Sequence, residues 1–259
     1  MKMIDRTQIW SSGGGVQSTA LAALICNGTL PCPDLALIVD TTRERSTTWD
    51  YLEQWTLPAL REVGVTLERV SAADYADVGL FEAEDSDTPR LLIPAYTAGT
   101  SERGGKLLNH CSTRWKRRVA QRWARSQGVL HADVWFGIST DELRRVRVSR
   151  ERWWQHTYPL IDLRMSRSDC YAVVQRAGWP EPPKSSCWMC PHMKPQEWQD
   201  MRLHKPTEFL AAADLEMEIQ DTQPHVYLTP AMQPLESQDF ESPFMNLDLA
   251  GCDSGMCHS

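Results

Sequence analysis

The first part of the chain alternates short apolar runs with longer stretches of mixed composition, and this alternation restricts the fold. Residues 7–12 are expected to form a short buried strand, and residues 18–26 a helix. Residues 35–40 form a continuous apolar run, which is typical of a strand covered on both faces. A second helix over 47–64, interrupted at Pro58 and ended by Gly64, then leads to a strand over 65–70. Strands and helices in this order predict a parallel sheet with right-handed crossovers.

The middle of the chain continues the same pattern. A helix is expected over 113–128, where Trp115, Val119 and Trp123 form an apolar stripe at helical spacing. The apolar run that follows, 132–137, predicts another strand. Together these elements predict a fold of the α/β class, a Rossmann-like α/β/α sandwich with a mainly parallel sheet, plus a cysteine-containing C-terminal extension.

The pattern becomes less regular in the second half, and we expect domain boundaries there. The predicted division is an α/β domain over 1–165, a helical, cysteine-containing region over 166–220 and an acidic, extended tail over 221–259. Within the first domain the irregular stretch 71–105 is expected to be a loop beside the ligand.

A run of three glycines separates the first expected strand from the first expected helix. Gly13, Gly14 and Gly15 allow a positive φ and close backbone approach, and Ser12 and Ser18 flank them. The free N–H groups and the dipole of a helix N-terminus converge at such a turn, which makes it a candidate site for a phosphate or sulfate group. A tight turn with nothing bound is the alternative.

Two common phosphate-binding loops are excluded by the residues present. The dinucleotide fingerprint needs a third glycine, where this chain has Val16, Gln17 and Ser18. The Walker loop needs a lysine directly after its glycine, and no lysine lies between Lys2 and Lys106. A different class of loop is therefore indicated.

Charge is distributed unevenly along the chain, whose net charge is −7. Residues 101–152 hold 13 Lys and Arg against five Asp and Glu, whereas ten Asp and Glu and no Lys or Arg follow Lys205. This distribution favours a localised anionic ligand over a chain coated for nucleic acid, with solvated basic helix faces as the alternative.

The remaining composition is that of an ordinary globular protein, with 42% hydrophobic and 24% charged residues. No stretch approaches the roughly 18 apolar residues that span a bilayer. The first ten residues lack the apolar core of a signal peptide, so a cytoplasmic protein is expected. In a reducing compartment the eight cysteines are expected to be free, metal-bound or catalytic.

Cys187 and Cys190 form a C-x-x-C pair, a spacing that lets two thiolates bind one metal or cluster. Spacing alone does not separate an iron–sulfur cluster from structural zinc, and an unmetallated thiol pair is a further alternative. Additional ligands are needed to close such a site. The candidates are Cys111 as the first choice, then His110, His192 and Cys170.

The glycine turn resembles the S-G-G-x-D-S loop of the PP-loop superfamily. Gly14, Gly15 and Ser18 match its two glycines and last serine, whereas Gly13 replaces the first serine and Gln17 replaces the aspartate. This variant form is similar to one found in phosphoadenosine-phosphosulfate (PAPS) reductase-like proteins of phages and bacteria. The missing aspartate puts the superfamily's metal-assisted ATP cleavage in question.

Three later segments fit the same resemblance. Asp40 and Thr41 resemble the D-T-G-x-E stretch after the second strand, residues 109–116 resemble a cysteine-then-lysine segment, and 137–145 resembles a G-x-x-x-x-E-x-x-R stretch. The nucleotide-binding residues that the resemblance implies are Ser12, Gly13, Gly14, Gly15, Gln17, Ser18, Asp40, Thr41, Lys116, Gly137, Asp141, Glu142 and Arg145.

The cysteines are interpreted through the same family. The resemblance favours an iron–sulfur cluster, of the 4Fe–4S type, over zinc, and the implied ligands are Cys111, Cys187, Cys190 and His110. Cys252 and Cys257 near the C-terminus match the position of the reductases' catalytic thiol, so they are the candidate catalytic residues. A tail cysteine pair without function, or one that binds metal, is the alternative.

The resemblance implies an enzyme that binds ATP or PAPS, with Mg²⁺ as a candidate ion, and performs sulfur chemistry. One alternative is ATP-dependent adenylylation and thiolation of DNA or tRNA. Another is a non-enzymatic nucleotide-binding module with a structural metal site. The candidate partners are a thioredoxin-like reductant, a cysteine desulfurase, a nucleic acid and a second copy of the chain.

Overall fold

The computed structural model describes residues 5–83, 89–98 and 105–241. These residues form two compact units, each built from two separate stretches of chain. The first unit comprises residues up to 77 together with 113–185, and the second comprises the described parts of 78–112 and 186–241. The units therefore divide the chain differently from the boundaries at 165 and 220 expected from sequence.

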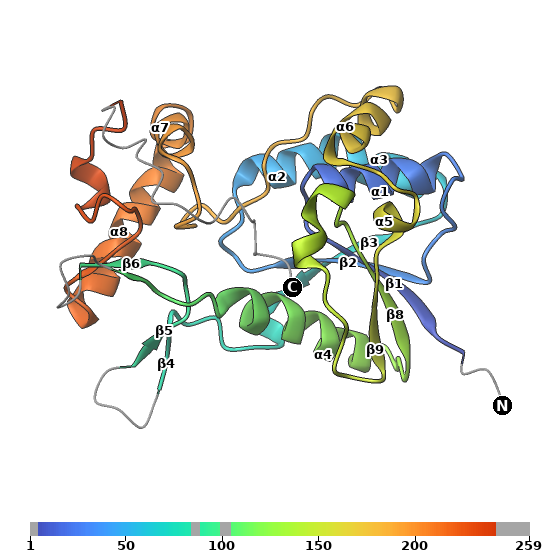
Figure 1. Cartoon of the computed structure of the whole chain (residues 1–259), viewed down its shortest axis with the longest axis horizontal. Helices are drawn as coiled ribbons and strands as arrows, with labels where there is room; N and C mark the ends of the chain where they lie inside the picture. Colours follow the sequence, from blue (N-terminus) through green and yellow to red (C-terminus); the bar gives the residue numbers. More distant parts are fainter. Residues whose placement is uncertain (1–4, 84–88, 99–104, 242–259) are drawn as a thin grey trace. The chain divides into compact units, whose positions relative to one another are not determined.

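The first unit contains a five-stranded sheet in the order β3-β2-β1-β8-β9, in which every neighbouring pair is parallel (Figure 1). The strands are β1 (Thr7–Ser12), β2 (Leu35–Asp40), β3 (Leu67–Ser71), β8 (Ala132–Phe136) and β9 (Trp154–Thr157). The prediction of an α/β, Rossmann-like fold with a mainly parallel sheet is confirmed. The strand β9 was not predicted.

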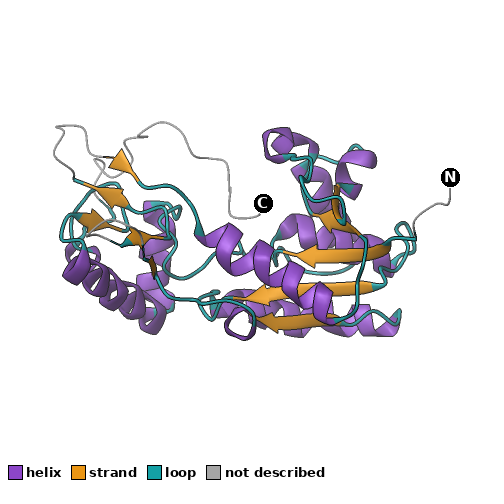
Figure 2. Ribbon diagram, turned by 90° about the horizontal axis from the view of Figure 1, so that it is seen from below, coloured by secondary structure: helices purple, strands orange, loops and turns teal. Residues whose placement is uncertain are grey.

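Helices cover both faces of this sheet. Helix α4 (Arg118–Ser126) lies on one face and is in front of the sheet in Figure 2. The helices of the opposite face are α1 (Val16–Cys26), α3 (Leu57–Glu62), α5 (Pro159–Asp162) and α6 (Arg167–Arg176). Helix α1 packs against α3, α5 and α6, which explains why its residues from Val16 to Ile25 are all buried.

Two helices contain a π-helical turn that periodicity alone did not reveal. The expected helix over 47–64 is α2 (Ser46–Tyr51), a π turn at Leu52–Thr56 and α3, with Pro58 in the first turn of α3. Because proline has no N–H group, a widened turn directly before it accommodates the missing bond. A second π turn, Ser112–Arg117, precedes α4.

The second unit contains two helices and short antiparallel strands. Its helices are α7 (Pro195–His204) and α8 (Pro206–Thr222). Its strands are β6 (Tyr96–Thr97), flanked by β7 (Gly105–Lys106) and β10 (Val226–Tyr227), and the separate pair β4 (Phe81–Glu82) and β5 (Arg90–Leu91). Helix α8 falls almost entirely within residues 166–220, which were expected to form a helical region.

Residues 221–241 were expected to be part of an extended tail, but they pack against α8. Glu216, which is 2% exposed, accepts hydrogen bonds from the backbone N–H groups of Leu228 at 2.7 Å and Leu235 at 2.6 Å. Burial raises the pKa of the Glu216 carboxyl group, and these two hydrogen bonds oppose the rise. A buried acidic side chain thus organises a segment whose composition suggested solvent exposure.

No helix within 5–83, 89–98 and 105–241 combines the length and the apolar composition that a membrane crossing requires.

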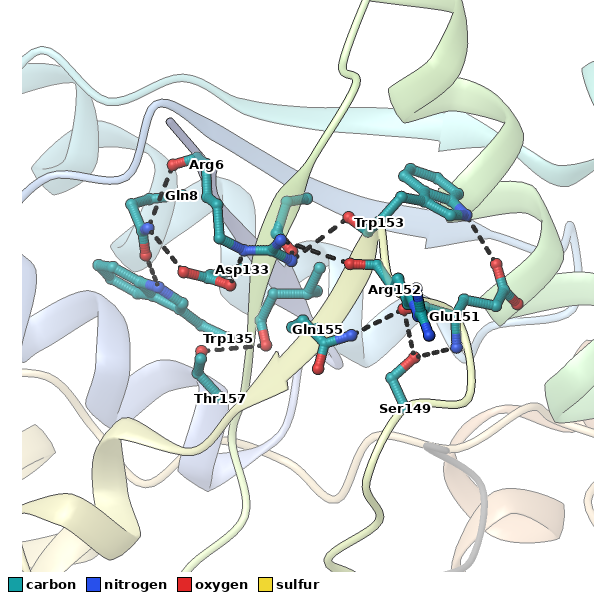
Figure 3. A network of polar contacts seen from close by, with 12 residues as sticks. Arg6, Gln8, Asp133, Trp135, Ser149, Glu151, Arg152, Trp153, Gln155 and Thr157 are labelled. Carbon is teal, nitrogen blue, oxygen red and sulfur yellow. Dashed lines mark hydrogen bonds and ion pairs between the residues drawn. The ribbon is translucent and has the colours of Figure 1, made fainter. Parts of the chain in front are cut away.

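A polar network joins three strands of the parallel sheet near their amino ends (Figure 3). The Arg6 Nε donates to Asp133 Oδ1 at 2.5 Å, and the same guanidinium donates to the carbonyl oxygens of Arg152 and Trp153, both at 3.4 Å. Gln8 Nε2 donates to the other Asp133 oxygen at 3.3 Å. Arg6 therefore links the chain at β1 to β8 and to the residues that lead into β9.

We predict that Arg6→Met lowers the free energy of unfolding by about 1–3 kcal/mol, because hydrogen bonds to charged groups contribute on this scale. The matched control is Arg150→Met, since Arg150 is exposed and has no hydrogen bond or ion pair with a described residue. Chemical denaturation compares the two variants. Equal stability of the two variants would contradict the role assigned to Arg6.

Candidate functional site

Three segments with candidate residues lie at the same edge of the first unit's sheet. The glycine turn follows β1, residues 41–45 follow β2, and residues 137–145 follow β8. Because the three strands are parallel neighbours, their carboxyl ends share one edge. The strand order reverses between β1 and β8, and ligands of open α/β sheets bind outside such a point.

The glycine turn is closely packed at two of its residues. Gly14 has φ +73°, and a Cβ atom there would lie 2.7 Å from Thr48 Cγ2. A Cβ atom on Gly15 would lie 2.9 Å from Ser185 Oγ. At Gly14 the positive φ and this close approach together require glycine, whereas at Gly15, with φ −95°, a side chain would have to displace the Ser185 hydroxyl. The turn is therefore enclosed by α2 and by the chain that follows α6.

The two flanking serines hold the turn together from inside. The Gly13 N–H group donates to Ser18 Oγ at 2.8 Å, and the Gly14 N–H group donates to Ser12 Oγ at 3.3 Å. Both hydroxyls act on the backbone of the turn itself. Their contribution to ligand binding, predicted from sequence, would thus be to shape the cradle.

The N-terminus of α1 keeps its donors available. Its N-cap, Gly15, has no side chain to accept a hydrogen bond, and its first turn holds no acidic residue. The N–H groups of Val16, Gln17 and Ser18 have no acceptor within the described part of the chain. These groups and the helix dipole produce a positive potential directly after the glycine turn.

Two buried hydroxyls near the strand ends also lack a partner among the described residues. Thr48 Oγ1 and Ser139 Oγ make no hydrogen bond there, although the residues are 1% and 0% exposed. Thr48 contacts the glycine turn as described above, and Ser139 follows β8. A buried hydroxyl without a partner costs free energy, so each is suited to pairing with a ligand or a water molecule.

Three polar side chains connect α1 to the segment after β8. Gln17 Nε2 donates to Glu142 Oε2 at 2.9 Å, and Arg145 Nη1 donates to the same oxygen at 2.8 Å. The Arg145 side chain is 10% exposed, and its buried Nε has no partner within the described residues. The guanidinium thus retains a donor for a further acceptor.

Two acidic residues at the end of β2 and just after it, Asp40 and Glu44, are hydrogen-bonded or ion-paired with neighbouring residues. Asp40 accepts from the Thr42 N–H group at 2.7 Å and from Arg69 Nε at 2.9 Å. Glu44, whose side chain is 5% exposed, accepts from Thr41 Oγ1 at 3.2 Å and pairs with Lys116 Nζ at 2.8 Å. The predicted site residues therefore each make a hydrogen bond or an ion pair with a neighbour at the carboxyl edge of the sheet. These residues are Asp40, Thr41 and Lys116.

Two predicted site residues after β8, Asp141 and Gly137, contact the helices α6 and α1 respectively. Asp141 accepts from the Arg167 N–H group and so binds the start of α6. A Cβ atom on Gly137 would lie 3.0 Å from the Ser18 nitrogen, so this glycine lets the β8 turn approach α1. The sequence reading missed Thr48, Ser139 and Ser185, because no local pattern relates these residues to the glycine turn.

The predicted cysteine ligands all belong to the second unit. Cys111 Sγ lies 3.1 Å from Asn109 Oδ1, and the Cys111 N–H group donates to Leu92 O at 2.8 Å. The Cys190 N–H group donates to Cys187 O at 3.1 Å, which closes the C-x-x-C turn. Within the described chain no group of three or more His, Cys, Asp and Glu residues is placed to hold a metal ion. The ligand set Cys111, Cys187, Cys190 and His110 stays a prediction.

The two other ligand candidates have separate surroundings. His192 Nδ1 lies 3.0 Å from Lys106 Nζ and accepts from it, because an ammonium group can only donate. Cys170 lies in the apolar core of the first unit, where burial raises its thiol pKa to about 12. Cys170 is therefore a core residue of the first unit. The candidate catalytic residues Cys252 and Cys257 lie outside the described residues.

No protein-family model and no curated protein matches the chain. Two solved structures are similar to it with a TM-score of 0.43 each. The PAPS reductase of Candida auris, in a phosphate complex, is 16% identical, and the match covers 69% of this chain and 76% of that chain. The U34-tRNA thiolase NcsA of Methanococcus maripaludis, with its 4Fe–4S cluster, is 11% identical, and the match covers 84% and 72%. At these identities and TM-scores, the similarity carries no inference about activity.

Proposed function

We propose that the chain is a PP-loop type enzyme that binds an adenine nucleotide through a phosphate or sulfate group at the glycine turn. The observation that carries this proposal is the set of hydrogen-bond donors at one sheet edge that lack acceptors within the described chain. They are the N–H groups of Val16, Gln17 and Ser18, the hydroxyls of Thr48 and Ser139, and the Nε of Arg145.

These donors suit a tetrahedral oxyanion. Helix N–H groups bind phosphate and sulfate directly, and the dipole of α1 favours negative charge at this point. Arg145 adds a charge-assisted donor, which is stronger than a neutral one. Because Gly14 and Gly15 have no side chains, the backbone can approach the oxyanion closely.

We further propose that the bound nucleotide undergoes thiol chemistry of the PAPS reductase type. In this reaction the Cys257 thiolate forms a bond to the sulfate sulfur, and the sulfur–oxygen bond to the nucleotide phosphate breaks. A second thiol then attacks the cysteine sulfur of the resulting thiosulfonate, which releases sulfite and leaves a disulfide. A thioredoxin-like dithiol would restore the thiols. A metal or cluster at Cys187 and Cys190 is not required for these steps.

The first test removes the hydroxyl of Thr48, a residue whose methyl carbon Cγ2 lies against Gly14. We predict that Thr48→Val raises the free energy of unfolding by about 1 kcal/mol, because it removes a buried hydroxyl without a described partner. The same change is expected to weaken nucleotide binding about tenfold, since the ligand loses a donor. Thermal unfolding and calorimetry with PAPS, adenylyl sulfate and ATP measure the two effects.

Thr56→Val is the matched control. Thr56 is also 1% exposed, and its Oγ1 has no hydrogen-bond partner in the described chain, but it lies further along the same helical stretch. This variant is expected to gain stability and to keep its affinity for the nucleotide. Equal affinities of the Thr48 and Thr56 variants would remove Thr48 from the binding site.

The second test separates the candidate reactions. We predict that deletion of residues 250–259 abolishes sulfite formation from PAPS or adenylyl sulfate and leaves nucleotide binding intact, because the tail would supply only the nucleophile. Both proteins are incubated with each nucleotide while sulfite and pyrophosphate are followed. Pyrophosphate from ATP with both proteins, without sulfite, would replace the reductase with an adenylylating enzyme. Turnover by neither protein would favour a binding module.

The third test concerns the C-x-x-C pair. Metal bound by Cys187 and Cys190 would contribute to folding of the second unit, since ligation free energy is also folding free energy. We predict that Cys187→Ser and Cys190→Ser each remove most bound iron or zinc from anaerobically purified protein and lower its melting temperature. Cys32→Ser, at an exposed cysteine of the first unit, is the control. Unchanged metal content in both pair variants would exclude the pair as ligands.

A further inference from the structure

The contact between Gln17 and Glu142 determines how charge is balanced at the proposed anion site. Gln17 lies in the first turn of α1 and is 8% exposed. Its amide nitrogen must face Glu142, because a carboxylate only accepts hydrogen bonds. Arg145 donates to the same Glu142 oxygen, so the three side chains form one hydrogen-bonded cluster.

This cluster has no net formal charge, since Gln17 is neutral and Glu142 pairs with Arg145. A divalent cation of the Mg²⁺ type needs several oxygen ligands, usually including one or two carboxylates. The amide nitrogen of Gln17 faces Glu142 Oε2, so at this contact Gln17 supplies a donor to the carboxylate and no second oxygen ligand for an ion. The cluster therefore lacks the second carboxylate that would favour a divalent cation, and Arg145 Nε, which has no partner within the described residues, can donate to an anion.

The other carboxylates after β2 and β8 are also engaged by donors. Asp40 accepts from Thr42 and Arg69, Glu44 pairs with Lys116, and Asp141 accepts from the start of α6. Each of these carboxylates already faces a cation or an N–H group. None of these contacts presents carboxylate oxygens from two acidic residues to a common point.

We infer that the proposed anion site binds its ligand without a divalent cation, and that Gln17 determines this property. The inference rests on the proposed function and names its substrate class. One sulfate or phosphate group would contact the N–H groups of α1 and the Nε of Arg145. The substrate is therefore a nucleotide sulfate or phosphate ester bound without metal, in preference to ATP as its magnesium complex.

The first experiment needs no nucleotide. Gln17→Glu changes charge with almost no change of shape, and it places a second carboxylate opposite Glu142, where a divalent cation would bridge them. Mg²⁺ is titrated into the intact protein by calorimetry, and thermal unfolding is measured with Mg²⁺ and with EDTA. We expect Mg²⁺ to bind and stabilise only Gln17→Glu, and Gln17→Met, a neutral variant of similar size, to remain insensitive.

The inference would be overturned if the unmodified protein binds Mg²⁺ and the Glu142→Gln variant does not. Because Glu142→Gln also removes the partner of Arg145, its fold is checked by circular dichroism and by thermal unfolding in EDTA. If Glu142→Gln does not fold, the Gln17→Met variant decides instead. Should the unmodified protein bind Mg²⁺ and Gln17→Met bind it equally well, the role of Gln17 is contradicted.

The second experiment measures the affinity for PAPS and adenylyl sulfate in EDTA and in excess Mg²⁺. We expect the dissociation constant of the unmodified protein to differ by no more than about twofold between the two buffers. Gln17→Glu is expected to bind at least about tenfold more weakly in EDTA and to regain affinity with Mg²⁺. Binding by the unmodified protein only with Mg²⁺ would overturn the inference. Absence of binding in both buffers would instead reject the proposed function, and the Mg²⁺ titration would still decide the role of Gln17.

Discussion

The parallel pairing of β1 with β2 on one side and β8 on the other is the constraint on which the site depends. Hydrogen bonds along both edges of β1 fix where this strand ends, and they bring the ends of β2 and β8 to the same edge. The glycine turn begins where β1 ends, so its position follows from the sheet. At the opposite ends of the strands, the Arg6 network links β1 to β8 and to the residues that lead into β9.

Charge at this edge is arranged in pairs, which leaves specific donors available. Lys116 and Arg145 are basic residues of the kind expected to face an anion, yet each pairs with a buried or nearly buried glutamate. Pairing holds these cations in fixed positions and satisfies the carboxylates, which would otherwise repel an anionic ligand. The positive character of the site therefore comes from the helix N–H groups together with basic side chains, among them Arg145, whose Nε has no partner within the described residues.

Several features of the site could be predicted from sequence because each is a local pattern. The strand, the three glycines and the helix follow one another within residues 7–26, and Glu142 and Arg145 lie three positions apart. The partners of these residues could not be predicted in the same way. Thr48 and Ser185 meet the glycine turn from distant parts of the chain, and their surroundings have no turn or motif that marks them. The packing of 221–241 was missed because acidic composition suggested exposure, whereas Glu216 is buried and hydrogen-bonded.

The sequence by itself determined the α/β class, the order of the first strands and helices, and the place of the glycine turn. Each follows from apolar periodicity and from the conformational freedom of glycine, which act over short stretches of chain. Only the tertiary structure decided that two compact units form from interleaved segments, that Gln17 donates to Glu142, and which donors keep no partner among the described residues. Those outcomes depend on contacts between residues more than 100 positions apart, which no local pattern specifies.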